Sequence, residues 1–177
     1  MSALDRLGSA LVMLLCLLYI IMLGGGTYEQ MNVTKLIVTA PPASFDMLMG
    51  EFPFSPVVFW TTFRPLTILL FIVTLVLCWK KRPTRNVLLA AFGIDSLVTI
   101  STFLYFAPEV GSMISAAAAN RVEGLEERAV RWYSLNYVRL AVFYVVGLLL
   151  LFAHRNFTLE SKTGYEALTA PHQRMSN

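Results

Sequence analysis

The fold is decided by residues 57–106, which read VVFWTTFRPLTILLFIVTLVLCW (57–79), KKRPTRN (80–86) and VLLAAFGIDSLVTISTFLYF (87–106). An α-helix rises about 1.5 Å per residue, so about 20 apolar residues are needed to cross the hydrocarbon core of a bilayer. Both apolar stretches have that length, and the basic segment between them, with its proline, is short. We therefore predict two membrane-spanning helices that are antiparallel neighbours.

Two more apolar stretches complete the predicted bundle. Residues 7–23 follow Arg6 and end at the glycine triplet 24–26, which favours a helix end or a hinge, and residues 132–152 form the last stretch. The chain is 56% apolar and 14% charged, more apolar than an ordinary soluble domain. We predict an all-α, four-helix transmembrane domain over residues 1–157. A cleaved signal peptide is an open alternative for the first stretch, because a basic start, a leucine-rich core and small residues also fit one.

The connecting segments differ in character. Residues 39–56 are rich in proline and apolar residues, so we predict an outer cap between the first two helices that folds over the bundle mouth or lies in the membrane interface. Residues 121–131 alternate arginine with glutamate, which indicates a short amphipathic helix with local charge pairs before the last span. Residues 158–177 are polar and aperiodic, and we predict a disordered tail.

The basic residues predict the orientation in the membrane. Lys80, Lys81, Arg82 and Arg85 lie between two spans, where they suit an anionic cytoplasmic membrane face rather than a nucleic acid. This placement puts both termini in the cytoplasm. The expected partners are membrane lipid, an apolar small molecule, and either a second copy of the chain or a membrane partner subunit.

Three charged residues lie inside the predicted spans: Arg64, Asp95 and Arg139. A charge in the membrane costs several kcal/mol unless it is paired or hydrated. Counted from the outer side, both arginines lie about 10 Å deep and Asp95 lies about one turn deeper. We predict that Asp95 pairs with one or both arginines, and that Glu29 supplies a second carboxylate from the outer side.

Polar and aromatic residues at helical spacing extend this predicted cluster. Asn136 and Trp132 precede Arg139 by three and seven residues, Trp60 precedes Arg64 by four, and Thr99 follows Asp95 by four. A guanidinium group stays charged and donates in a planar fork, which suits an anion, an enolate or a quinone-type carbonyl. The predicted pocket therefore has these candidate catalytic and binding residues: Arg139, Asn136, Arg64 and Asp95, with Trp132, Trp60, Glu29 and Thr99.

Other interpretations of the same residues remain open. Buried ion pairs and asparagine hydrogen bonds can simply fix helix register, which would make the protein a non-catalytic membrane subunit or scaffold. A small exporter needs a water-accessible carboxylate, but flanking arginines would hold Asp95 ionised. The chain has only two histidines, so we expect no haem, metal centre or other cofactor.

The start of the last span also resembles a known family. Residues 132–139, WYSLNYVR, resemble the W-x-x-x-N-x-x-R pattern at the start of the last helix in the anthrone-oxygenase-like family of small four-helix membrane proteins. Residues 26–29 (GTYE), 41–44 (PPAS) and Phe59-Trp60 are similar to the outer segment of some bacterial members, which adds Tyr28 to the binding candidates and implies a bacterial plasma membrane.

Most members of this family have no known function, but the resemblance to its fungal members implies oxidation of a polyketide anthrone to a quinone without a bound cofactor. Asn136 and Arg139 would line the pocket and Trp132 would flank it. The family often has a Pro-x-Asn turn after its third helix, whereas here Pro108 is followed by Glu109 and Val110, which weakens the transfer of an enzymatic function.

Overall fold

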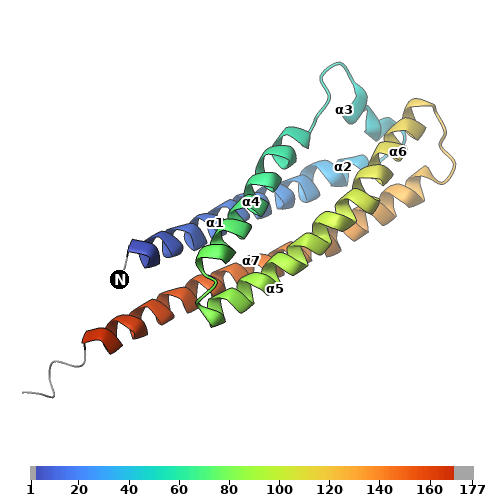
Figure 1. Ribbon diagram of the computed structural model, residues 1–177. Helices are drawn as coiled ribbons and strands as arrows, with labels where there is room; N and C mark the ends of the chain where they lie inside the picture. Colours follow the sequence, from blue (N-terminus) through green and yellow to red (C-terminus); the bar gives the residue numbers. More distant parts are fainter. Residues whose placement is uncertain (1–2, 170–177) are drawn as a thin grey trace, which may run out of the picture.

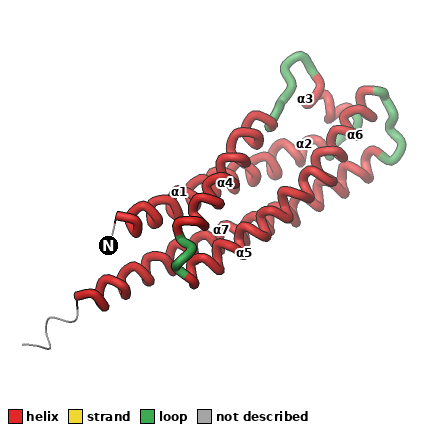
Figure 2. The backbone as a smooth tube through the Cα atoms, in the orientation of Figure 1, coloured by secondary structure: helices red, strands yellow, loops and turns green. Residues whose placement is uncertain are grey.

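The computed structural model of the protein describes the backbone of residues 3–169 and the side chains of residues 3–162. Four long helical units run antiparallel to their neighbours in a bundle, and loops make up only short parts of the described chain (Figures 1 and 2). The units are α1 (Ala3–Tyr28) with η1 (Glu29–Thr34) and α2 (Lys35–Ile37); α4 (Val57–Leu77); α5 (Arg82–Ser101) with η3 (Thr102–Phe106) and α6 (Ala107–Ala118); and α7 (Leu125–Thr169).

All four units are long and apolar enough to cross a membrane, counting only the described residues. Many of their large apolar side chains point away from the bundle, among them Leu69, Leu97 and Leu148. Such a surface would be unfavourable in water and suits contact with lipid tails. These features support a multi-pass membrane protein.

The buried side chains form two clusters. The inner cluster, named for the end of the bundle where α1 begins, is built from all four long units, with Tyr19, Phe71, Leu88 and Leu150 at its centre. The outer cluster, at the opposite end of the bundle, joins α2, η3, α6 and the start of α7. The candidate functional site lies between these two apolar regions.

The first helix does not end at the glycine triplet, so that expectation was wrong. A Cβ atom on Gly25 would lie 2.6 Å from the ring of Phe59, and one on Gly26 would lie 3.4 Å from the ring of Trp60. These glycines therefore serve the close approach of α4 to α1, and the helix continues through them to Ile37.

The third helix continues beyond residue 106, where the predicted span ended. Pro108 lies in the first turn of α6, and the π-helical turn η3 comes directly before it. A proline ring in a continuous α-helix collides with the carbonyl four residues earlier and removes a hydrogen bond. The wider π turn lets the chain pass this proline and remain helical.

Of the charged residues before the fourth span, those from Glu126 to Arg131 belong to α7 itself, whereas Arg121 and Glu123 lie in the loop before it, so they do not form a separate amphipathic helix. Arg128 donates to Glu109 of α6 at 2.8 Å and also to Ser112, so its partner lies on another helix and not among the nearby glutamates. This contact ties the start of α7 to α6.

The C-terminal end of α7 also differs from the prediction. Its helix runs to Thr169, so residues 158–169 are helical where we expected disorder, and residues 170–177 lie outside the described residues. Phe157 and Ser161 are buried, and Lys81 donates to the Ser161 hydroxyl at 3.0 Å. Contacts to the turn between α4 and α5 therefore stabilise this part of the helix.

The connection between α2 and α4 contains two short elements, η2 (Ala43–Phe45) and α3 (Asp46–Met49). Phe45 is fully buried in the outer cluster against α6 and α7, whereas Phe52 is 91% exposed. One end of this connection is thus anchored. The predicted cap over the bundle mouth stays a prediction.

Candidate polar pocket beneath the outer end

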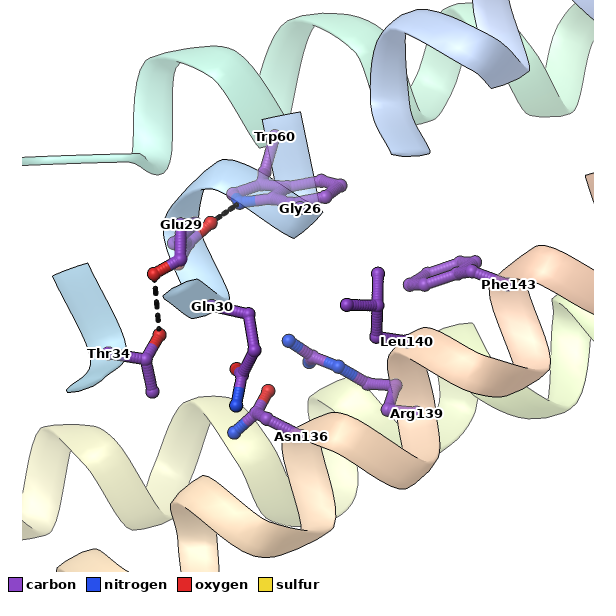
Figure 3. Close-up of a pocket in the computed structure, with 9 residues that line it drawn as sticks. All are labelled: Gly26, Glu29, Gln30, Thr34, Trp60, Asn136, Arg139, Leu140 and Phe143. Atoms are coloured by element: carbon purple, nitrogen blue, oxygen red, sulfur yellow. Dashed lines mark hydrogen bonds between the residues drawn. The ribbon is translucent and has the colours of Figure 1, made fainter. Parts of the chain in front are cut away.

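A small polar pocket opens between η1, α4 and α7. Its volume is about 20 Å³, which is enough for about one water molecule. Figure 3 shows the residues that line it: Gly26 of α1; Glu29, Gln30 and Thr34 of η1; Trp60 of α4; and Asn136, Arg139, Leu140 and Phe143 of α7.

The π-helical turn η1 explains why three of its residues face the same pocket. Residues five apart would point about 140° away from each other on an α-helix, but they nearly align on a π-helix. Here the Thr34 hydroxyl donates to the Glu29 carbonyl oxygen at 3.1 Å, and both residues line the pocket. The turn therefore brings the Glu29 carboxylate and the Thr34 hydroxyl to one side.

Glu29 is held by a neighbouring helix. The Trp60 indole N–H donates to its Oε2 at 2.7 Å, as Figure 3 shows. Glu29 and Arg139 attract each other electrostatically across the pocket. However, the three ion pairs within 4 Å among the described residues do not include this pair. The two opposite charges are thus near each other but not in direct contact.

Arg139 is supported from its other side by the second π-helical turn. Its guanidinium carbon lies 4.4 Å from the ring centre of Phe106, and one nitrogen donates to the Thr102 hydroxyl at 3.3 Å. A guanidinium group has five N–H donors. Arg139 makes only this hydrogen bond to the described residues, so its other N–H groups can donate to a ligand in the pocket.

Two buried amides form the floor of the pocket. Asn136 donates to the Trp132 carbonyl oxygen at 2.8 Å, and Gln30 donates to the Tyr133 carbonyl oxygen at 3.1 Å. Both side chains are thereby fixed to the backbone of α7. Figure 3 shows them side by side, next to the guanidinium of Arg139.

Arg64 and Asp95 form a separate network, so the single cluster that we predicted is divided in two. Arg64 pairs with Asp95 Oδ1 at 2.9 Å and also donates to the Asp95 carbonyl oxygen and to Thr99. Tyr19 donates to the same Oδ1 at 2.8 Å, and the Arg64 guanidinium lies 5.1 Å from the ring centre of Phe143. Asp95 thus pairs with one arginine, and Glu29 faces the other. The network connects α1, α4, α5 and α7.

The other predicted site residues lie outside the pocket. Trp132 is buried in the outer cluster, where its indole N–H donates to the Phe106 carbonyl oxygen at 3.0 Å. Tyr28 is 64% exposed. Thr99 belongs to the Arg64 network.

Five pocket residues were missing from the predicted site: Gly26, Gln30, Thr34, Leu140 and Phe143. Leu140 and Phe143 follow Asn136 by four and seven residues, so helical spacing could have identified them. Gln30 and Thr34 depend on the π-helical turn, for which the sequence gives no signal that we know.

No family model matches this chain, and no curated protein or solved structure is significantly similar to it. The residues of the pocket are therefore the basis for a function of this chain.

Proposed function

We propose that this membrane protein binds an apolar, aromatic or quinone-like small molecule and that Arg139 donates to a carbonyl or oxyanion oxygen of that ligand. One observation carries the proposal. The Arg139 guanidinium borders the pocket and makes a single long hydrogen bond, while Arg64 makes three hydrogen bonds to Asp95 and Thr99 and pairs with the Asp95 carboxylate. Guanidinium groups bind oxyanions and polarised carbonyl groups in this way.

The size of the pocket limits how such a ligand binds. A space of about 20 Å³ accepts one oxygen atom with its nearest neighbours, not a ring system. Trp60 and Phe143 separate this space from a second hollow lined also by Tyr19, Met22 and Leu23, which as it stands has no room for water. The ring of the ligand takes a place between Trp60 and Phe143, and binding requires one of those rings to turn.

The resemblance to the anthrone-oxygenase-like family extends the proposal to a reaction. In an oxidation of an anthrone by dioxygen to the quinone and water, Glu29 accepts a proton from the ring methylene, Arg139 stabilises the oxyanion that forms, and Asn136 orients the ring. Dioxygen adds to the resulting carbanion, the peroxide takes the proton back from Glu29, and loss of water from this hydroperoxide gives the quinone. Glu29 suits this role better than Asp95 because it faces Arg139 across the pocket, while Asp95 is held by Arg64 and Tyr19.

A pair of probes tests the binding step in purified protein. The anionic 2-hydroxy-1,4-naphthoquinone and the hydrocarbon naphthalene have the same ring system and differ in the oxygen groups. Arg139→Gln should weaken binding of the naphthoquinone about tenfold to a hundredfold, the value of one charge-assisted hydrogen bond, and leave naphthalene unchanged.

The matched control is Arg131→Gln, an exposed arginine about two turns earlier on the same helix. Unaltered naphthoquinone binding in a folded Arg139→Gln protein refutes the proposal. Oxygen consumption in the presence of anthrone tests the reaction separately. If the protein binds the naphthoquinone but consumes no oxygen with anthrone, it is a binding protein and not an oxygenase.

A second function, that of a non-catalytic membrane subunit, is favoured by the hydrogen bonds of the Arg64–Asp95 network, which join α1, α4 and α5 without using a residue that lines the polar pocket. If the protein has this role, Asn136→Leu should lower its thermal stability, and neither the naphthoquinone nor naphthalene should bind to the unaltered protein. Affinity purification from native membranes then recovers a partner at a fixed ratio.

A further inference from the structure

The four cations of the basic segment have different surroundings, although the sequence presents them as one run. The segment covers the turn between α4 and α5 and the first residues of α5, at the end of the bundle where α1 begins (Figure 1). Lys81 points into the protein. It pairs with Asp5 at 3.0 Å, donates to Ser161 at 3.0 Å and lies 4.4 Å from the ring centre of Phe157.

The other three cations reach the protein surface. Lys80 and Arg82 are exposed, and Arg85 is half-buried. The Arg85 guanidinium lies 5.3 Å from the ring centre of Trp79, donates to the Asn86 side-chain oxygen at 3.2 Å and 3.4 Å, and donates through its third nitrogen to the Trp79 carbonyl oxygen at 3.5 Å. None of these three takes part in an ion pair within 4 Å among the described residues. Trp79 and Asn86 therefore fix the orientation of the Arg85 guanidinium, and no carboxylate in the described part of the chain neutralises its charge.

The surrounding acidic groups do not compensate this charge. The sequence has no acidic residue from 78 to 94. Two carboxylates near this segment bind groups other than these three cations. Asp5 pairs with Lys81, and Glu160 accepts from the Thr84 hydroxyl at 2.6 Å. The three cations thus form a local positive surface.

The position of this surface matches the headgroup region of a bilayer. The turn directly follows the apolar α4, whose exposed Val76 and Leu77 suit lipid tails, and Trp79 is also exposed. Tryptophan prefers the boundary between tails and headgroups. The cations beside it therefore lie at the level of the lipid phosphates.

We infer that Trp79, Lys80, Arg82 and Arg85 form a binding site for the headgroup of an anionic phospholipid. Arg85 donates to two phosphate oxygens through its planar fork, and Lys80 and Arg82 add positive charge around the same phosphate. Trp79 contacts the glycerol region and fixes the depth of Arg85. Lys81 is a structural residue and is not part of this site.

The test compares lipids in full-length protein purified in a mild detergent. Native mass spectrometry counts retained dioleoyl-phosphatidylglycerol or dioleoyl-phosphatidylcholine over a titration of each. The wild type should retain phosphatidylglycerol preferentially. The variant K80Q/R82Q/R85Q should lose that preference by a factor on the order of one hundred, since each cation near a membrane surface contributes about fivefold.

Two further variants keep the result interpretable. The matched control K35Q/R121Q/R131Q removes three exposed cations from the outer end and should keep the preference of the wild type. Lys81→Gln should lower the melting temperature and also keep the preference. If the triple variant at the turn melts early, Arg85→Gln alone should still reduce the preference at least fivefold.

Several outcomes overturn the site: equal retention of both lipids by the wild type, unchanged preference in K80Q/R82Q/R85Q, or an equal loss in the outer-end control. Inorganic phosphate at the same concentrations should not displace the lipid. Displacement would assign the cations to a soluble phosphate instead.

Discussion

Replacing Asp95 with asparagine should destabilise the protein strongly, although the side chain keeps its shape. The amide oxygen can still accept from Tyr19, and Arg64 keeps its bonds to the Asp95 carbonyl oxygen and Thr99, so the main loss is the negative charge. At 2.9 Å and an effective dielectric constant of about 20, that charge is worth about 4–6 kcal/mol.

Part of this lost attraction is offset, because burying an asparagine amide costs less desolvation free energy than burying a carboxylate. Removing one partner of a buried ion pair typically costs about 3–5 kcal/mol, and we expect Asp95→Asn to fall in this range. The melting temperature in detergent should drop by about 10 °C. Asp95 is 1% exposed and Arg64 is 14% exposed, so solvent can compensate little of the loss.

A double-mutant cycle isolates the interaction. Unfolding by sodium dodecyl sulfate in mixed micelles gives the free energies of Asp95→Asn, Arg64→Met and the double variant. The double variant should be about 2 kcal/mol more stable than the sum of the single changes predicts, because no uncompensated charge remains buried.

The control cycle uses Arg128 and Glu109, which have the same chemistry at 2.8 Å but are 36% and 23% exposed. Their coupling should be below about 1 kcal/mol. Additive effects at Arg64 and Asp95, or equal couplings in the two cycles, would show that the buried network does not hold the four helices together.

Three further changes test other parts of the fold. Gly8→Ala should destabilise the bundle by about 1–3 kcal/mol in thermal unfolding, because the new Cβ would lie 2.8 Å from the ring of the buried Phe157. Gly24→Ala has open space around it and should be neutral or stabilising in the same assay. Burial raises the pKa of the Cys78 thiol from 9.0 to about 11, so its thiolate fraction at pH 8 is about a hundredfold lower, and N-ethylmaleimide should modify it only after unfolding; rapid modification of the folded protein would contradict its position. Phe45→Ala should cost about 3–5 kcal/mol and loosen the connection after α2, measured by limited proteolysis, whereas Phe52→Ala, at a largely exposed position, should have little effect.

The sequence predicts the number and character of the helices because the membrane requires about 20 apolar residues per crossing, and these stretches are readable directly. It does not predict where each helix ends. The glycine triplet suggests a helix break, but in the structure Gly25 allows Phe59 to pack closely against a continuous helix. Pro108 suggests a helix end, but a π-helical turn before it lets the helix continue. In both places a contact or a backbone change that is not local in sequence decides the result.

The polar residues show a similar limit. Depth along each span brought Arg64, Asp95 and Arg139 to similar levels and indicated that they would interact. Depth does not give the rotation of each helix about its axis, and rotation decides that Asp95 meets Arg64 while Glu29 faces Arg139. Two π-helical turns set the rotation of Glu29 and Thr102, and a period of 3.6 residues cannot anticipate them.

The Arg64–Asp95 contact has a consequence for how this protein enters the membrane during synthesis. Arg64 leaves the ribosome 31 residues before Asp95, and an unpaired arginine at the centre of a helix opposes insertion by about 2.5–3.5 kcal/mol. Only residues 78–81 separate α4 from α5, so the second helix follows almost immediately with the compensating carboxylate. We therefore expect the two helices to partition into lipid together, as a preformed hairpin.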